Sequence, residues 1–243
     1  MPEAADAILL CGGAGLRLRS TIGNAPKGLA EVAGRPILEL LLHQLRRHGF
    51  ERVILAVGYG KEAIQAHFGE RACGLRVAYS VETDPLGTGG ALGNAAALIE
   101  TDDVLIMNGD SYTDANLAQF AAEHSASGAE VSLVVVPIDA RADCGTVSVD
   151  SRGQLTGFWE KQGAVDARYV NAGIYMASRR ILASIPHRQV SLERELFPQW
   201  LGEGRNIRAF VWQAACIDIG TPERFESAQR LLENVESVTS RQD

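Results

Sequence analysis

The chain has 243 residues, 46% of them hydrophobic, which is enough for one large α/β domain or two small ones. With 23 basic against 30 acidic residues, the net charge of −7 argues against nucleic acid as the main partner. Residues 1–6 lack the basic region of a secretory signal, and no stretch reaches membrane-spanning length. We therefore expect a cytoplasmic protein that does not bind membranes.

Short apolar runs alternate with segments that can be helical in the first half of the chain. This alternation predicts βαβ units on a parallel sheet. The expected strands are residues 7–11, 53–57, 75–79 and 104–107. Apolar residues at helical spacing between Ile37 and Leu45 predict a helix that packs on this sheet, with Pro36 and Gly49 near its ends.

A glycine cluster follows the first expected strand directly. Residues 11–19 read CGGAGLRLR, and Pro26-Lys27 follows a few residues later. Glycines let backbone N–H groups approach an anion closely, and basic side chains add positive charge, so the run favours a nucleoside triphosphate over an empty loop. Leu18 replaces the third small residue of a dinucleotide fingerprint, and Gly60-Lys61 continues into Glu62 rather than the Ser or Thr of a P-loop.

The second half has closely spaced apolar runs separated by turn signals, which predict antiparallel strands. The expected strands are residues 131–136, 145–149, 155–159 and 170–176, followed by a helix over 191–201 and a strand over 207–211. A closing helix starts at Thr221-Pro222, and its expected inner face comprises Phe225, Ala228, Leu231, Leu232 and Val235. With no linker or repeat, we read residues 1–243 as one domain with a nucleotide half (1–127) and an accessory half (128–243).

Two aspartates stand at expected strand ends. Asp110 follows the strand that ends at Met107, and Asp218 follows the apolar stretch 214–217. Ligands of open α/β sheets bind beyond the carboxyl ends of the strands, where Asp110 faces the glycine loop unless it only starts a turn. Two carboxylates from distant parts of the chain suit a hard divalent cation that bridges phosphate oxygens, so we expect Mg²⁺.

Two further segments suit a second substrate. Glu160-Lys161 ends an expected strand, where the lysine can hold a phosphomonoester and the glutamate a sugar hydroxyl, unless the two form only an exposed ion pair. Asn171-Ala172-Gly173 places an amide and bare backbone within a hydrophobic strand, which favours close approach of a polar ligand.

In this order, the motifs resemble those of sugar-1-phosphate nucleotidylyltransferases over nearly the whole chain. They are residues 12–18, Pro26-Lys27, residues 82–90, Gly109-Asp110, Glu160-Lys161, residues 171–173 and residues 218–222. The resemblance implies a Rossmann-like α/β fold with a mixed, mostly parallel sheet flanked by helices, a smaller antiparallel sugar-binding portion and no C-terminal β-helix. It also implies Mg²⁺ and attack of a sugar 1-phosphate on the α-phosphorus of a nucleoside triphosphate, with release of pyrophosphate.

The resemblance assigns expected roles to individual residues. Arg17 and Lys27 are expected to be catalytic, and Asp110 and Asp218 to bind the metal. Expected nucleotide-binding residues are Leu10, Gly12, Gly13, Ala14, Gly15, Glu82, Pro85, Gly87, Thr88 and Asn108. Expected sugar-phosphate-binding residues are Gly109, Glu160, Lys161, Asn171 and Gly173. The chain departs from the family at Leu16, where threonine is usual, and at Gly28, where proline is frequent; a homo-oligomer is compatible with the resemblance.

Glu82 favours guanine, because a carboxylate can accept from both N1–H and the exocyclic amine of that base. Residues 85–91 and 191–198 most resemble bacterial D-glycero-α-D-manno-heptose-1-phosphate guanylyltransferases. Mannose-1-phosphate guanylyltransferases come next, then uridylyl- or thymidylyltransferases acting on a hexose 1-phosphate. A catalytically silent sensor of nucleotide sugars and a nicotinamide-dependent oxidoreductase are the alternatives from other classes.

Overall fold

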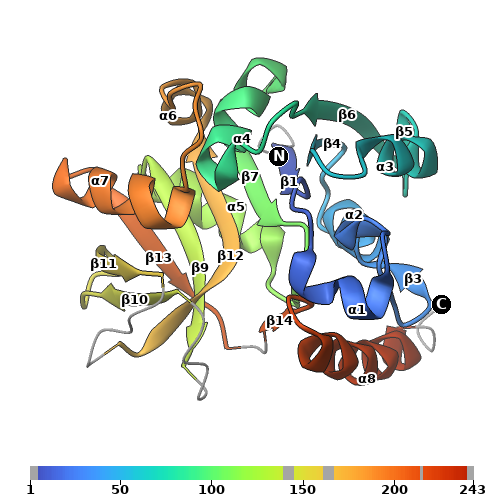
Figure 1. Ribbon diagram of the computed structural model, residues 1–243. Helices are drawn as coiled ribbons and strands as arrows, with labels where there is room; N and C mark the ends of the chain where they lie inside the picture. Colours follow the sequence, from blue (N-terminus) through green and yellow to red (C-terminus); the bar gives the residue numbers. More distant parts are fainter. Residues whose placement is uncertain (1–4, 139–144, 161–166, 214–215, 240–243) are drawn as a thin grey trace.

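The centre of the molecule is a parallel sheet, as the sequence predicts (Figure 1). The computed structural model describes residues 5–138, 145–160, 167–213 and 216–239, with side chains of the last helix as far as residue 232. Strand β1 (Asp6–Leu10) lies between β4 (Arg52–Val57) and β7 (Asp103–Asn108), and β6 (Leu75–Val81) extends the sheet beyond β4. All of these neighbours pair in parallel.

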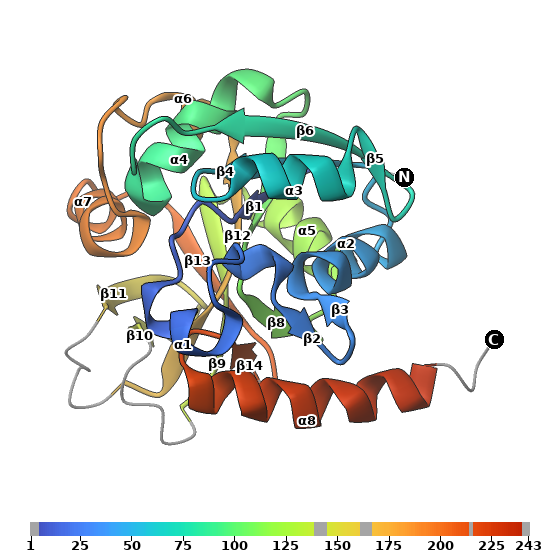
Figure 2. The ribbon, with the colours of Figure 1, turned by 45° about the vertical axis from the view of Figure 1, so that its right-hand side comes forward.

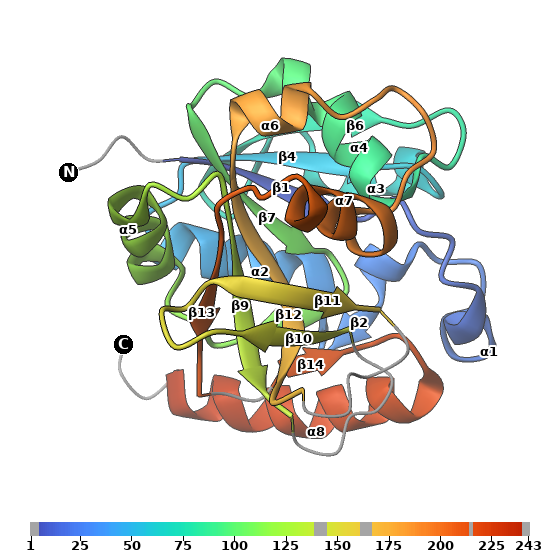
Figure 3. The same ribbon diagram turned by 90° about the vertical axis from the view of Figure 1, so that its left-hand side faces the viewer.

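An antiparallel portion continues the same sheet beyond β7. It contains β12 (Tyr169–Ser178), β9 (Val131–Pro137), β10 (Thr146–Val149) and β11 (Leu155–Trp159). β12 pairs with β7, β9 and β10, whereas β13 (Ile207–Val211) runs parallel to β9. Figure 3 shows β10 and β11 standing out from the second half of the sheet. The expected mixed sheet with a smaller antiparallel portion is confirmed.

Helices cover both faces of the sheet because successive strand residues point to opposite sides. Leu9 and Leu55 pack into one core, and Ile8 and Ile54 pack into the other. The first core is covered by α2 (Ile37–Arg47), α3 (Lys61–Phe68), α5 (Leu117–Ser127) and α8 (Pro222–Thr239). The second core is covered by α4 (Gly87–Ala95), α6 (Arg179–Ala183) and α7 (Phe197–Gly202).

The sequence did not predict most of the short elements. They are η1 (Leu16–Leu18), α1 (Arg19–Ile22), η2 (Lys27–Leu29), β2 (Glu31–Val32), β3 (Arg35–Pro36), β5 (Arg71–Ala72), η3 (Ala96–Leu98), β8 (Ser111–Thr113) and β14 (Cys216–Asp218). The expected helix over 191–201 begins with a π-helical turn, η4 (Leu192–Leu196), and continues as α7. No helix in the described ranges is both long and apolar enough to cross a membrane.

One expected core position is wrong. Leu231 is 46% exposed, whereas Ala228 and Leu232 are buried and Phe225 is partly buried. α8 runs along the bottom of the molecule in Figure 2, and Phe225, Ala228 and Leu232 pack against the core. Residues at i and i+4 share one face of a helix, and Leu231 lies at the edge of the packed face. The side chain of Val235 lies outside the described residues.

A buried ion pair joins β1 to β4 at their amino ends, opposite to the glycine loop. Nη1 of Arg52 lies 2.7 Å from Oδ2 of Asp6, and Nη2 donates to the carbonyl of Leu98 at 2.8 Å. The same Asp6 oxygen accepts from the amide of Glu100 at 2.6 Å. Both side chains are nearly inaccessible, so the Asp6 carboxylate depends on Arg52 for charge compensation, while Nη2 of Arg52 also lies 3.4 Å from Oε1 of the exposed Glu100.

Replacing Arg52 by methionine therefore leaves a buried carboxylate unpaired. We expect Arg52→Met to lower the free energy of unfolding by about 3–5 kcal/mol in urea titrations. Arg76→Met is the matched control, because Arg76 is the register partner of Arg52 on β6 but is exposed, and its loss should cost less than about 1 kcal/mol. Equal losses for the two variants would show that the buried pair has no special role.

Candidate active site

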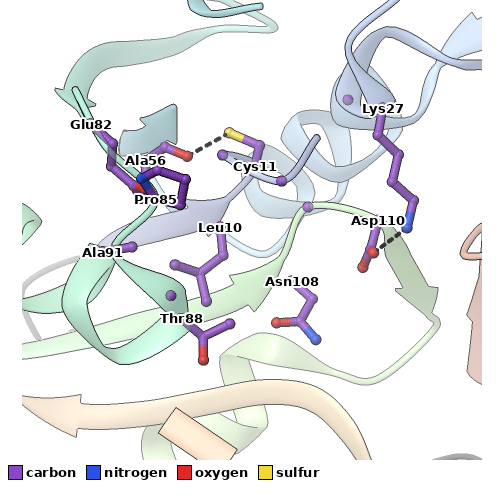
Figure 4. Close-up of a pocket in the computed structure, with 15 residues that line it drawn as sticks. Leu10, Cys11, Lys27, Ala56, Glu82, Pro85, Thr88, Ala91, Asn108 and Asp110 are labelled. Carbon is purple, nitrogen blue, oxygen red and sulfur yellow. Dashed lines mark hydrogen bonds and ion pairs between the residues drawn. The ribbon is translucent and has the colours of Figure 1, made fainter. Parts of the chain in front are cut away.

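A cleft opens at the carboxyl ends of β1 and β7. From β1 the chain builds β4 and β6 on one side, and it then crosses back to place β7 on the other side of β1, which is the kind of switch point where open α/β sheets bind ligands. The cavity there has a volume of about 320 Å³ (Figure 4). It is lined by Leu10, Cys11, Gly12, Gly13, Lys27, Gly28, Ala56, Glu82, Pro85, Gly87, Thr88, Ala91, Asn108, Gly109 and Asp110.

Glycines form the part of the cavity wall where the two strands meet. The amide of Gly109 donates to the carbonyl of Leu10 at 2.9 Å, and a Cβ on Gly109 would lie 2.8 Å from that oxygen. The strands therefore approach this closely only because residue 109 has no side chain. Gly15 has a φ of +57°, and a Cβ there would lie 3.3 Å from Cβ of Lys27, so the glycine loop and the lysine are adjacent.

Opposite charges meet at one end of the cavity. Nζ of Lys27 lies 2.5 Å from Oδ2 of Asp110, and Figure 4 marks this pair. The Ser111 hydroxyl donates to Oδ1 of Asp110 at 3.0 Å. Burial alone would raise the pKa of the Asp110 carboxyl, but the Lys27 charge and these hydrogen bonds outweigh it and hold the pKa below its usual range. Asp110 is therefore ionised at neutral pH.

The second aspartate is brought to the same end by strand pairing. β14 pairs antiparallel with β8, so that Asp218 lies opposite Ser111 and the amide of Ile219 donates to the carbonyl of Asp110 at 3.0 Å. Oδ2 of Asp218 lies 2.7 Å from Nη1 of Arg224. A Cβ on the adjacent Gly220 would lie 3.6 Å from Nη2 of Arg17. Two acids and three basic side chains thus surround this end.

Glu82 lies at the other end of the cavity, beyond β6. It is buried, and its Oε2 accepts from the amide of Leu86 at 3.1 Å. Oε1 would lie 3.3 Å from a Cβ on Gly12, so the carboxylate faces the glycine loop. Burial raises the pKa of Glu82, and the Leu86 hydrogen bond partly offsets that rise. Figure 4 shows Glu82 and Pro85 well separated from the Lys27–Asp110 pair.

The glycines that follow Glu82 have a packing role. The carbonyl of Val190 accepts from the amides of Gly89 and Gly90, at 3.0 and 3.2 Å, in the first turn of α4. A Cβ on Gly87 would lie 2.7 Å from that same carbonyl oxygen. Two amides of this helix turn are therefore occupied by Val190.

The expected sugar side is built around a bulge in β12. The pairing of β12 with β9 shifts between Asn171 and Tyr175, and Gly173 has a φ of +73° within the bulge. The Gly173 amide donates to Oδ1 of Asn171 at 3.0 Å, and a Cβ on Gly173 would lie 2.5 Å from Nδ2 of Asn108. The amide of Asn171 donates to the carbonyl of Gly145 at 2.8 Å. Glu160 lies beside Gly145, since its Oε2 would be 3.2 Å from a Cβ on that glycine. Lys161 lies outside the described residues.

The expected site residues thus fall into two groups. Those that line the cavity are Leu10, Gly12, Gly13, Lys27, Glu82, Pro85, Gly87, Thr88, Asn108, Gly109 and Asp110. Ala14, Gly15, Arg17, Glu160, Asn171, Gly173 and Asp218 are not among the lining residues. Arg17 and Asp218 nevertheless both lie next to Gly220, beside the charged end, and Gly173 lies against Asn108, which lines the cavity. Leu16 is 67% exposed and does not line the cavity.

Sequence reasoning missed several residues at the site. Cys11, Gly28, Ala56 and Ala91 also line the cavity, and Arg224 pairs with Asp218. The position of Ala56 near the end of a strand beside β1 was a usable signal, whereas nothing in the sequence linked Arg224 to an aspartate six residues earlier. Burial, with a smaller contribution from Glu82, raises the pKa of the Cys11 thiol, so this residue lines the cavity in its protonated form.

The comparison with protein families decides the family. The model of the nucleotidyl transferase family matches residues 6–235. The chain belongs to this family. Nucleotidyl transferases were also what the ordered motifs resembled, and the expected family is therefore confirmed.

Individual relatives agree with the family assignment. A mannose-1-phosphate guanylyltransferase of Mycobacterium tuberculosis is 38% identical over 90% of this chain, which spans 62% of that protein. A D-glycero-α-D-manno-heptose 1-phosphate guanylyltransferase of Aneurinibacillus thermoaerophilus is 33% identical, with 94% of this chain and 99% of that protein covered. The structure of HddC from Yersinia pseudotuberculosis complexed with GMP-PN superposes with a TM-score of 0.81 at 30% identity, covering 94% of this chain and 99% of that one.

The structure explains the departure at Gly28, where the family frequently has proline. A Cβ on Gly28 would lie 2.5 Å from Cδ1 and 2.9 Å from Cγ of Leu38, which is fully buried in α2. The space that a side chain would need at position 28 is therefore filled by Leu38.

We expect Gly28→Ala to lower the free energy of unfolding by about 1–3 kcal/mol through overpacking. Gly13→Ala is the control, because a Cβ there has no neighbour within 4 Å and should leave thermal unfolding unchanged. In the double variant Gly28→Ala/Leu38→Ala the overpacking is relieved, so its loss should be smaller than the sum of the two single losses. A strictly additive result would contradict this explanation.

Proposed function

We propose that the protein catalyses guanylyl transfer from GTP to a manno-configured sugar 1-phosphate, with a manno-heptose 1-phosphate as the first candidate. A phosphate oxygen of the sugar 1-phosphate forms a bond to the α-phosphorus of GTP. The bond from that phosphorus to the bridging oxygen breaks, and the β- and γ-phosphates leave as pyrophosphate. Residues 1–127 supply the nucleotide half of the site and residues 128–243 the sugar-phosphate half.

The observation that carries this proposal is the single cavity that joins Glu82 at one end to Lys27 and Asp110 at the other. Nucleophile and leaving group are both phosphates, so positioning and neutralisation of charge can supply most of the rate acceleration. Arg17 and Lys27 provide the positive charge, and the loop over residues 12–15 provides backbone amides. Lys161 and Glu160 then hold the sugar phosphate, together with Asn171, Gly173 and Gly109.

The two aspartates suit Mg²⁺. In the part of the chain that the structure describes, no three His, Cys, Asp or Glu side chains are grouped to hold a metal. Mg²⁺ does not need such a group, since proteins usually hold it through one or two carboxylates together with substrate phosphates. Asp110 and Asp218 would provide those carboxylates, and a bound Mg²⁺ would neutralise charge on the transferring phosphate. Lys27 would then contact phosphate oxygens instead of Asp110. The reaction belongs in the cytoplasm, where nucleoside triphosphates are available.

Both named relatives support guanine and a manno-configured sugar. Glu82 fits this base because it lines the cavity and keeps one carboxylate oxygen clear of the Leu86 hydrogen bond. The relative named for a manno-heptose 1-phosphate matches this chain over 99% of its own length, whereas the relative named for mannose 1-phosphate matches over 62%, which favours heptose as the first candidate. Mannose 1-phosphate is the second candidate, because the relative with the higher identity acts on that sugar by name.

Pyrophosphate release across a matrix of substrates tests the proposal. The matrix combines GTP, ATP, UTP and dTTP with mannose, glucose and manno-heptose 1-phosphates, with and without Mg²⁺. We expect release with GTP and a manno-configured sugar 1-phosphate only when Mg²⁺ is present. Release with UTP or dTTP and glucose 1-phosphate would overturn both assignments, and no release with any pair would favour a silent regulatory relative.

Loss of either aspartate should abolish most turnover while the protein stays folded. We expect Asp110→Asn and Asp218→Asn each to lower kcat by on the order of 100-fold or more, because a metal contributes several kcal/mol at the transition state. Asp102→Asn is the control, since Asp102 is exposed beside the amino end of β7. Near-normal rates in both active-site variants would rule out the metal assignment.

Replacing Glu82 by glutamine should affect stability and base selectivity in opposite directions. The raised pKa of Glu82 predicts the effect on stability, and its hydrogen bonding to guanine predicts the effect on selectivity. Its folded-state pKa lies above the unfolded value, so ionised Glu82 destabilises the fold at neutral pH, and this penalty disappears as the pH falls through the folded pKa. Glu82→Gln should therefore unfold at an equal or higher temperature at pH 7.5, while the preference for GTP over ATP falls roughly 10-fold.

The control for that prediction is Glu70→Gln, because Glu70 is exposed at the end of α3. It should change neither quantity. Unchanged base selectivity in Glu82→Gln would remove the basis for naming guanine, and a lower unfolding temperature at pH 7.5 would contradict the direction of the pKa shift.

A further inference from the structure

A buried carboxylate lies behind the cavity, on an element that the family motifs did not single out for a role. Glu193 belongs to the π-helical turn η4 and is buried although it is an acid. π-Helical turns are rare and occur frequently at functional sites. Its two oxygens accept hydrogen bonds from the side chains of Thr88, Ser191 and Tyr175, so Glu193 is the centre of a hydrogen-bond network.

The first branch of the network fixes Thr88, at the start of α4. The Thr88 hydroxyl donates to Oε2 of Glu193 at 2.6 Å and accepts from the amide of Leu192 at 2.8 Å. Oε2 also accepts from the hydroxyl of Ser191 at 3.2 Å. A hydroxyl has one proton, so the proton of Thr88 is committed to Glu193. Thr88 lines the cavity and therefore offers a ligand only a lone pair and its methyl group.

The second branch leads to the sugar side. The hydroxyl of Tyr175 donates to Oε1 of Glu193 at 3.4 Å and accepts from Nδ2 of Asn171 at 2.7 Å. Oδ1 of Asn171 in turn accepts the Gly173 amide that closes the β12 bulge against Asn108. Burial and the negative charge of Glu193 raise the pKa of Tyr175 well above its ordinary value, so the phenol keeps the proton that it donates.

We infer that Glu193 is a positioning residue that holds the nucleotide side and the sugar side of the cavity in one geometry, through Thr88 and through Tyr175 and Asn171. It does not need to touch either substrate. Its carboxylate orients the Thr88 hydroxyl as an acceptor, and it keeps the Asn171 side chain on the bulge, so that Asn108 faces the cavity from a fixed position.

The geometry of this inference depends only on the hydrogen bonds described above. Its kinetic test also rests on the proposed function, because it measures turnover of GTP. In Glu193→Gln, the amide keeps one acceptor oxygen and presents a donor in place of the other, so either the Thr88 branch or the Tyr175 branch loses its acceptor and the network reorganises. We expect kcat/KM for GTP to fall roughly 10- to 100-fold, the range for a hydrogen bond to a charged group.

A double-mutant cycle separates positioning from a general structural effect. Thr88→Val removes the hydroxyl and keeps the shape, and Thr88→Ser keeps the hydroxyl. If Glu193 acts through Thr88, Glu193→Gln/Thr88→Val should lose no more activity than the more severe single variant, and Thr88→Ser should retain most activity. The inference would be overturned if the loss of activity in the double variant equalled the product of the losses in the two single variants. It would also be overturned if Thr88→Ser were as impaired as Thr88→Val.

Glu195→Gln is the matched control. Glu195 lies on the same turn and accepts from the amide of Ser191 at 2.9 Å, but it is exposed and pairs with Arg188. It should change kcat/KM by less than about twofold, as is usual for an exposed pair. If it matches Glu193→Gln, the effect belongs to the turn as a whole and positioning by Glu193 is wrong.

Two measurements keep this test separate from that of the proposed function. Wild-type pyrophosphate release decides whether the reaction is guanylyl transfer. Calorimetric binding of each nucleoside triphosphate to the variants then repeats the cycle without turnover, using whichever nucleotide the wild type binds. If Glu193→Gln fails to fold, the comparison of Thr88→Val with Thr88→Ser and of Tyr175→Phe with wild type still decides whether these hydrogen bonds affect the site.

Discussion

The short ladder between β8 and β14 is the contact on which the site depends. It places residues 216–218, close to the last helix, beside residues 111–113 directly after β7. Without it, Asp218 and Arg224 would have no fixed relation to Asp110 and Lys27. Local sequence cannot provide this contact, because more than one hundred residues separate the two strands and each strand has only three residues. The large sheet supports the ladder by fixing where β7 ends.

The remainder of the charged end follows from that contact. Each aspartate there is paired with a basic residue, Asp110 with Lys27 and Asp218 with Arg224. The Lys27 charge holds the pKa of Asp110 below its usual range, so this carboxylate is in the ionised state that a metal requires. At the other end of the cavity, burial acts on Glu82 in the opposite direction and raises its pKa. One cavity thus combines an ionised, paired end with a buried end suited to hydrogen bonding of a base.

Elements with strong periodicity could be predicted from the sequence. The parallel strands around β1 and the helix α2 are each buried on a clear pattern, and the glycine cluster and Asp110 lie at strand ends that the alternation already located. The short strands β8 and β14, the π-helical turn and the exposure of Leu231 could not be predicted in this way, because each depends on contacts with distant segments. The same holds for Glu193, whose hydrogen-bond partners come from α4 and β12 as well as from its own segment. Long-range hydrogen bonds leave no periodic signal.

We propose that the β8–β14 contact creates one metal and phosphate site from both halves of the chain. A crystal structure with Mn²⁺ in place of Mg²⁺ and a non-hydrolysable GTP analogue tests this most directly, because Mn²⁺ gives an anomalous signal. We expect a Mn²⁺ peak between the carboxylates of Asp110 and Asp218, with Lys27 moved from Asp110 onto a phosphate oxygen and the base at Glu82. A Mn²⁺ peak away from both aspartates, or an analogue bound with its phosphates far from Lys27, would contradict it.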